Sequence, residues 1–187
     1  MNEDNKLIER TLRGEKRAFE MIIRKYQQPL FNYIGRMIGQ RELALDFTQE
    51  VFIKTYASLS SFNPQYKFRT WLFKIASNLI IDYWRKKKIK AFSLDLQLES
   101  GQRSLAGEVP DRELSLAKKF ELAQLREKIL SSLEKIPPLL RELFILRHIN
   151  DFTYEEIAEI KNLPVGTVKN KVFQAKELMR QLLEEKI

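Results

Sequence analysis

The chain has 187 residues, of which 44% are hydrophobic, and it carries a formal net charge of +8 and no cysteine. That length allows one or two small domains, and the lack of cysteine excludes disulfides and thiolate metal sites. The sequence contains no run of about 18 apolar residues that could cross a membrane, and its polar first residues are unlike a signal peptide, so we expect a cytoplasmic protein.

Helical periodicity runs through the first ninety residues. Apolar side chains at spacings of three and four predict helices over residues 4–12, 16–38, 41–58 and 68–88. Gly14 and Gly39 mark breaks between helices, and residues 60–64 form a loop. Residues 1–90 contain 18 lysines and arginines against 9 acidic residues, so this is the most basic part of the chain and suits contact with a polyanion.

The predicted helix over residues 41–58 has one side on which acidic, amide and aliphatic side chains mix. They recur at i, i+3, i+4 and i+7: Asp46, Gln49, Glu50 and Ile53. Phe52 lies on the other side, with Leu45 and Tyr56. A mixed strip of this kind can bind a basic partner helix, but periodicity alone favours the alternative, a solvated outer surface.

Aromatic and cationic side chains are interleaved in the segment that follows. Seven of the twenty aromatic residues lie between Phe62 and Trp84, and the basic run RKKK comes directly after them. Aromatic planes beside cations suit single-stranded DNA, because every base offers a face for stacking and every link offers a phosphate. Polar Asn63 and Thr70 could hold a base outside the stack. For each aromatic residue the alternative is packing in a helical core.

Residues 91–115 differ in composition from the rest of the chain. They contain two glycines, a proline and several serines, with 5 acidic residues against 2 basic ones, which predicts a flexible linker. Helical periodicity resumes at Leu116 and pauses at Pro137-Pro138. We therefore expect an all-α protein with two small helical domains, over residues 1–90 and 116–187.

Residues 153–180 predict two helices joined by a tight turn. Thr153 and Glu156 have the spacing of a capping box, and Pro164 suits the first position of a second helix. Apolar side chains of that helix form one stripe at helical spacing: Val165, Val168, Val172, Ala175, Met179 and Leu182. This is the pattern of a helix-turn-helix whose second helix lies in a DNA major groove.

The opposite face of the second helix is polar and cationic. It carries Thr167, Lys169, Asn170, Lys171, Phe173, Gln174 and Lys176. Amides can read base edges, lysines can hold phosphates, and a phenylalanine can contact a thymine methyl. The alternative is a hairpin with a solvated face, where an outward phenylalanine beside lysines would be unusual. We expect a four-helix second domain that ends in this helix-turn-helix.

Three strings, in this order, resemble a bacterial RNA polymerase sigma factor of the extracytoplasmic-function group. They are DFTQEVFIKTY, then FRTWLFKIASNLIIDYWRKKK and, after the linker, the segment from IPPLLRELF to VKNKVFQAKELMRQL. The resemblance covers nearly the whole chain. It implies a sigma factor that binds core RNA polymerase and directs it to specific promoter DNA, without a small-molecule substrate and under the control of an anti-sigma factor.

The resemblance also implies roles for individual residues. The strip on the helix over 41–58, with Phe52, would dock on the clamp coiled coil of the largest polymerase subunit. The outward face of the C-terminal helix would read the minus-thirty-five promoter element. The segment after residue 60 would read and melt the minus-ten element through Phe62, Asn63, Lys67, Phe68, Thr70, Trp71, Lys74, Asn78 and Arg85.

The chain departs from the family pattern at several positions. Leu45 stands where an acidic residue is usual, and Asn170-Lys171 stands where Ser-Arg is usual. Lysine cannot grip guanine with two parallel hydrogen bonds as arginine does, so the resemblance leaves the preferred promoter sequence open. In the turn, Lys161-Asn162 replaces the common Leu-Gly, and asparagine tolerates the left-handed backbone that the turn needs.

The residues alone leave two other functions open. A stand-alone helix-turn-helix regulator would carry a ligand-binding or dimerisation domain in the N-terminal half, in place of an aromatic and basic helix. A DNA-processing enzyme would need a carboxylate or histidine cluster at metal-ligand spacing, whereas the sequence has His148 as its one histidine and no phosphate-cradling glycine-rich loop. We therefore expect a protein that is not an enzyme and has no cofactor or metal.

Overall fold

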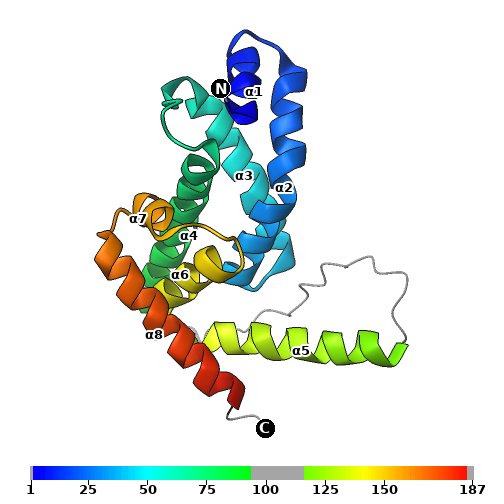
Figure 1. Cartoon of the computed structure of the whole chain (residues 1–187), viewed down its shortest axis with the longest axis vertical. Helices are drawn as coiled ribbons and strands as arrows, with labels where there is room; N and C mark the ends of the chain where they lie inside the picture. Colours follow the sequence, from blue (N-terminus) through cyan, green and yellow to red (C-terminus); the bar gives the residue numbers. More distant parts are fainter. Residues whose placement is uncertain (1, 94–115, 185–187) are drawn as a thin grey trace.

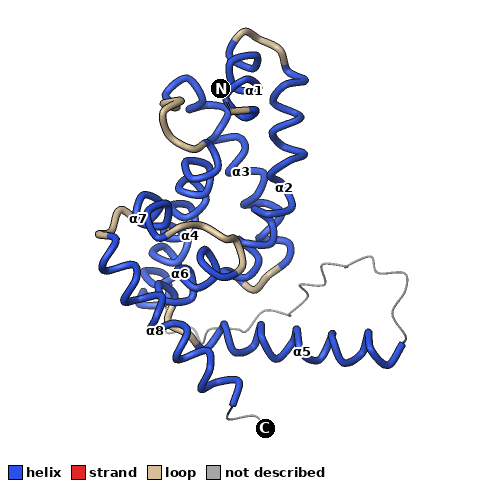
Figure 2. Tube along the Cα trace, in the orientation of Figure 1, coloured by secondary structure: helices blue, strands red, loops and turns tan. Residues whose placement is uncertain are grey.

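A computed structural model describes residues 2–93 and 116–184, and this part of the chain is helical without strands (Figures 1 and 2). The N-terminal helices are α1 (Glu3–Leu12), α2 (Lys16–Ile38), α3 (Arg41–Ser58) and α4 (Phe68–Ser93), with the short 3-10 helix η1 (Leu59–Ser61) after α3. The C-terminal helices are α5 (Leu116–Lys135), α6 (Pro138–His148), α7 (Tyr154–Lys161) and α8 (Val165–Glu184). The prediction of an all-α protein is confirmed.

The predicted helix boundaries agree closely with the observed ones. Helix α4 continues to Ser93, past the predicted end at residue 88. The remainder of the predicted linker, residues 94–115, lies outside the described residues. Gly39 ends α2 in the left-handed region at φ 79°, where its amide donates to the Gly35 carbonyl, and this allows α3 to start two residues later and pack along α2.

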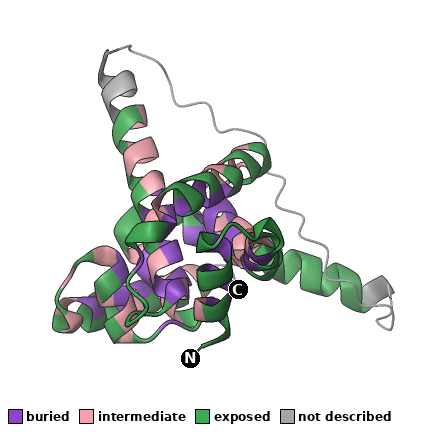
Figure 3. Cartoon of the chain, turned by 90° about the horizontal axis from the view of Figure 1, so that it is seen from above, coloured by how far each residue is buried: buried purple, intermediate pink, exposed green. Residues whose placement is uncertain are grey.

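Helices α1 to α4 enclose the N-terminal part of the core. The apolar stripes of α2, α3 and α4 face one another, as helical periodicity requires. The side chains that fill the space between them are almost fully buried: Ile22, Leu30, Tyr33, Val51, Leu72, Phe73 and Ile80. Burial of these side chains leaves the opposite sides of α3 and α4 facing solvent. Figure 3 shows the buried residues gathered at the centre of the molecule, with exposed residues around them.

Helices α6, α7 and α8 pack closely together, and the last turns of α5 join them. Leu133 at the end of α5 is 1% exposed, whereas Phe120 near its start is 66% exposed. Figure 1 shows the first part of α5 extending away from the rest of the chain. The predicted four-helix arrangement of the C-terminal half is thus present, with α7 and α8 as its last hairpin.

The N-terminal and C-terminal helices share one continuous hydrophobic core. Helix α4 packs against α7, and α2 packs against α6. Phe152, between α6 and α7, is fully buried, and its ring centre lies 4.9 Å from that of Phe73 on α4. Burying a phenylalanine contributes about 1.5–3 kcal/mol, so this one contact is a substantial part of the attachment between the two halves.

Candidate nucleic-acid interface

The sequence of the α7–α8 hairpin fixes its geometry at both ends of α7. The Thr153 hydroxyl accepts a hydrogen bond from the Glu156 amide at 3.2 Å, and the Glu156 carboxylate accepts one from the Thr153 amide at 2.7 Å. The predicted capping box is therefore present. Asn162 ends α7 with φ 52° in the left-handed region, as expected for the turn. Pro164 lies directly before α8, and its carbonyl accepts from the Val168 amide.

Helix α8 has the two predicted faces. Val168, Val172, Ala175 and Met179 are buried against the domain, while the Phe173 side chain is 65% exposed. The rest of the predicted DNA face divides by exposure, with Thr167 and Lys171 half-buried and the others exposed: Lys169, Asn170, Gln174 and Lys176. The helix therefore presents a polar, cationic and partly aromatic surface to solvent.

Arg147 of α6 and Tyr154 of α7 lie beside this face. The Arg147 guanidinium lies 4.8 Å from the Tyr154 ring centre, and the Lys169 ammonium lies 5.7 Å from the same ring. Desolvation, with the charges of Arg147 and Lys176, lowers the pKa of His148. Arg147 and Tyr154 are not among the residues predicted from the sequence. The signals that could have found them are the position of Arg147 in the last turn of α6 and of Tyr154 directly after the helix cap.

Helix α4 carries a second exposed polar strip. Lys74, Asn78 and Arg85 follow one another at i, i+4 and i+11, which places them on one side of the helix, and all three are exposed. Arg85 also pairs with Asp82 at 2.8 Å, one turn before it on the same helix. A cation, an amide and a second cation in line along one helix can contact successive phosphates and bases.

Several predicted minus-ten residues are buried. Phe62, Phe68 and Thr70 are 7%, 1% and 3% exposed, and Trp71 is half-buried. The Phe62 ring centre lies 5.5 Å from that of Phe68 and 5.3 Å from that of Trp71, so these aromatic side chains pack on one another. Core packing takes the side chains of Phe62, Phe68 and Thr70 out of solvent in this conformation, and direct contact between them and DNA stays a prediction.

The loop between η1 and α4 is flanked by Phe62 and Phe68 of this aromatic cluster. Its Asn63 side chain accepts from the Gln65 amide at 3.0 Å, and its Pro64 carbonyl accepts from Asn5 of α1 at 3.2 Å. Asn63 and Lys67 are exposed. Lys67 pairs with Glu156 of α7 at 2.8 Å. Desolvation raises the pKa of Glu156, but hydrogen bonds from Lys67 and the Thr153 amide outweigh it and hold the pKa below its ordinary value.

The predicted polymerase-docking strip on α3 is largely on the surface. Asp46 and Gln49 are exposed, and Ile53 is 68% exposed, which is high for an aliphatic side chain. Glu50 is half-buried and pairs with Lys54 at 3.3 Å. Phe52 is the exception: it is 7% exposed and makes an edge-to-face contact with Phe19 on α2. Phe52 therefore supports the helix from inside, and its part in polymerase docking stays a prediction.

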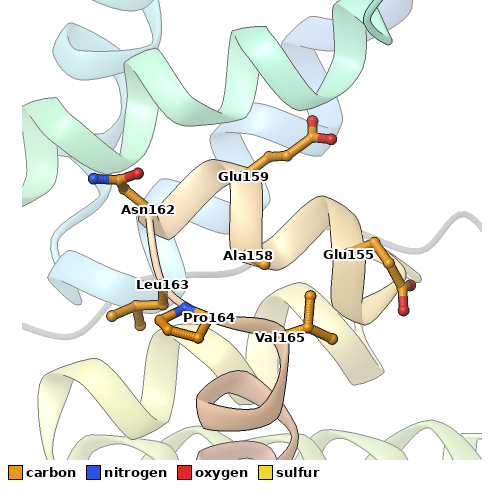
Figure 4. A pocket seen from close by; sticks show the side chains of 7 residues that line it. All are labelled: Glu155, Ala158, Glu159, Asn162, Leu163, Pro164 and Val165. Carbon is orange, nitrogen blue, oxygen red and sulfur yellow. The ribbon is translucent and has the colours of Figure 1, made fainter.

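A shallow hollow lies on the outer side of the hairpin (Figure 4). Carboxylates, residues of the turn and small apolar side chains line it. The lining residues are Glu155, Ala158, Glu159, Asn162, Leu163, Pro164 and Val165. The two carboxylates oppose binding of a phosphate, so the hollow does not extend the cationic face of α8.

Two kinds of feature are absent from the part of the chain that the structure describes. Residues 2–93 and 116–184 contain no group of three or more histidine and carboxylate side chains that could hold a metal ion. None of their helices is long and apolar enough to cross a membrane.

Exposed polar and cationic side chains lie on α4 and α8, and surfaces of this kind suit contact with nucleic acid. Comparison with protein families agrees, because residues 22–89 match sigma-70 region 2 and residues 126–179 match sigma-70 region 4. The chain belongs to the extracytoplasmic-function group of bacterial RNA polymerase sigma factors. It is a sigma factor and not a stand-alone regulator.

Similar proteins cover nearly the whole chain. The extracytoplasmic-function sigma factor SigW of Bacillus subtilis is 35% identical over 96% of this chain and 96% of its own length. The sigma-H factor of Pseudomonas aeruginosa is 32% identical, over 97% of this chain and 94% of its own length. The fold resembles that of RpoE in its complex with the anti-sigma factor NepR from Bartonella quintana, with a TM-score of 0.72, 23% identity and coverage of 89% of this chain and 96% of that one.

Proposed function

We propose that this sigma factor reads promoters at two places, the minus-ten element with α4 and its preceding loop and the minus-thirty-five element with α8. The observation that carries the proposal is the exposed polar and cationic strip on each of these two helices, one in each family region. Lysines and Arg85 would hold phosphates, while Asn78 and Asn170 would read bases.

The minus-ten contacts would come from the exposed members of the predicted set. Asn63 and Lys67 in the loop, and Lys74, Asn78 and Arg85 along α4, are the side chains that solvent and DNA can reach. Phe62 and Phe68 would act indirectly, because they support the loop from below. The binding energy from captured bases would offset the few kcal/mol that each unstacking step costs.

The polymerase would dock on the exposed strip of α3. Asp46, Gln49 and Glu50 offer polar and acidic groups, and Ile53 offers apolar area at the same surface. Burying this exposed aliphatic side chain against a partner would contribute favourable free energy, because it removes apolar area from water. The protein would work beside the polymerase in the cytoplasm, would catalyse no reaction itself, and would be held inactive by an anti-sigma factor.

Replacing Ile53 tests the docking surface. Ile53→Asp should weaken binding to core RNA polymerase about tenfold or more, because it puts a charge where apolar area is to be buried. Met21→Asp is the matched control, since Met21 is also an exposed apolar residue, at 48%, but lies on α2 outside the strip. Equal affinity of the two variants, measured by titration of labelled protein with polymerase, would exclude this surface.

Transcription from a promoter library tests the function as a whole. Core RNA polymerase is incubated with the library, with or without the protein, and transcript starts are mapped. We expect a set of starts that appears only with the protein and shares two sequence blocks upstream. If no start depends on the protein, promoter selection is not its function.

A further inference from the structure

Four helices meet at one buried carboxylate, that of Glu142 on α6. The Glu142 oxygens accept hydrogen bonds from Tyr33 of α2 at 2.7 Å, from Ser77 of α4 at 2.6 Å and from Lys161 of α7 at 2.5 Å. The Lys161 ammonium also donates to the Ser77 hydroxyl at 2.8 Å. Two of these residues come from the region 2 part of the chain and two from the region 4 part.

The cluster is fully enclosed. The side chains of Lys161 and Glu142 are each 4% exposed, and Tyr33 and Ser77 are fully buried. Burial, followed by the negative charge and hydrogen bond of Glu142, raises the pKa of Tyr33 well above its ordinary value, so this phenol stays a donor. A buried ion pair is tolerated only when its remaining hydrogen-bonding groups are satisfied, and Tyr33 and Ser77 supply those partners.

A second group of contacts joins the same two halves at the start of α4. The Arg69 guanidinium lies 4.2 Å from the Phe152 ring centre and donates to the Asn150 carbonyl. Lys67 pairs with Glu156. Both cations therefore have partners from the C-terminal half, although they lie beside the loop assigned to the minus-ten element.

This arrangement does not suit simultaneous reading of both promoter elements. Their centres are about 25 base pairs apart, which is about 85 Å along a straight duplex at 3.4 Å per base pair. Helix α4 is in direct contact with α7, the first helix of the hairpin that contains α8 (Figure 1). The two reading surfaces must separate before both elements can be bound.

We infer that Tyr33 and Ser77 form an intramolecular docking surface for the Glu142–Lys161 pair, which holds the helix-turn-helix domain against α4 in a closed, non-reading state. The occupant of the surface is the chain's own C-terminal domain. When the two halves separate, water can solvate the charges of Glu142 and Lys161, which stay neighbours within the C-terminal domain. The closed state can therefore open reversibly. The biological consequence rests on the proposed function, but the closed state itself does not.

Single-molecule energy transfer can measure the closed state directly. Since the chain has no cysteine, dyes can be attached at Glu20→Cys on α2 and Gln181→Cys on α8, two exposed positions outside the proposed binding surfaces. The full chain is studied without polymerase or DNA. Tyr33→Phe and Ser77→Ala each remove donors to the charged cluster and keep the residue's shape. Ser132→Ala is the matched control, because Ser132 is also buried but its hydroxyl donates only to a carbonyl of its own helix.

The wild type and Ser132→Ala should give mainly a high-transfer population. Tyr33→Phe and Ser77→Ala should each lower the closed-to-open ratio about tenfold or more, since each loses a hydrogen bond to a charged group. If Tyr33→Phe or Ser77→Ala shows reduced helical circular dichroism, it is partly unfolded and Lys161→Leu is used in its place. Lys161→Leu leaves Glu142 buried without its cation and should lower the closed-to-open ratio in the same way. An open wild type, or an unchanged ratio in these variants, would overturn the docking surface. Failure of the promoter-library experiment would instead contradict the proposed function.

Discussion

His148 is the one histidine of the chain, and its pKa reports the burial and the nearby positive charges beside the α7–α8 hairpin. Desolvation, with the charges of Arg147 and Lys176, lowers its pKa from an ordinary value of about 6.5. Because the pKa is lower in the folded state, the contribution of His148 to the free energy of unfolding should be fully present above pH 6.5 and should be lost as the pH falls from there through the folded-state pKa.

The titration of His148 can be followed by NMR as a single imidazole signal. We expect a pKa below 6.5 in the folded protein, and Lys176→Gln should raise it toward that value by removing one nearby cation. Lys171→Gln is the control, because the charge of Lys171 is not among the causes of the shift. An equal response to both variants would mean that net charge, and not local geometry, sets the pKa.

Lys169 and Asn170 are adjacent in the sequence but have different proposed tasks. Lys169→Ala should weaken DNA binding on every sequence and reduce the slope of log affinity against log salt by about 1, since one phosphate contact is lost. Binding of promoter DNA by the full chain together with core RNA polymerase, measured at several salt concentrations, gives this slope. An unchanged slope would place Lys169 away from the phosphates.

At the scale of helices, the capping box of Thr153 and Glu156 fixes where α7, the first helix of the hairpin, begins. Thr153→Ala removes the side-chain acceptor for the Glu156 amide and should lower the free energy of unfolding by about 1 kcal/mol. Thr153→Ser keeps a hydroxyl and should restore most of the loss. Urea unfolding of the three proteins checks this, and an equal loss in both variants would assign the effect to the threonine methyl group.

Local signals made most elements predictable. The capping box at Thr153, the breaks at Gly14 and Gly39, and the three-and-four spacing along α8 each depend on residues within a few positions of one another. Such patterns reflect hydrogen bonds and packing inside one helix or turn, so the sequence alone is enough to identify them.

Residue roles on α3 and α4 were less predictable. An aromatic side chain at helical spacing serves equally well as a core residue or as a stacking surface, and Phe52, Phe62 and Phe68 are core residues. The resemblance to the family named Lys74, Asn78 and Arg85, and the structure shows that all three are exposed on one side of α4. Deciding between these roles required the contacts with α2, such as the edge-to-face pair of Phe68 with Tyr26.

At the scale of the whole molecule, the packing between the two halves was not predicted. Tyr33 and Glu142 are 109 positions apart, and Ser77 and Glu142 are 65 apart. No periodicity connects residues at such distances. The composition of residues 91–115 predicted a tether, and a tether is compatible with both a separated and a closed arrangement. The shared core through Phe73 and Phe152 is therefore new information from the structure.

Promoter preference measured for two variants tests the account most directly. A library with both upstream elements randomised is transcribed by core polymerase with the wild type, Asn78→Ala or Asn170→Ala, and the sequences upstream of the mapped starts are compared. We predict that Asn170→Ala relaxes preference only in the minus-thirty-five block and Asn78→Ala only in the minus-ten block, with both proteins still producing transcripts. If either variant alters the preference in both blocks equally, or if neither alters any, the two-surface reading of the promoter is wrong.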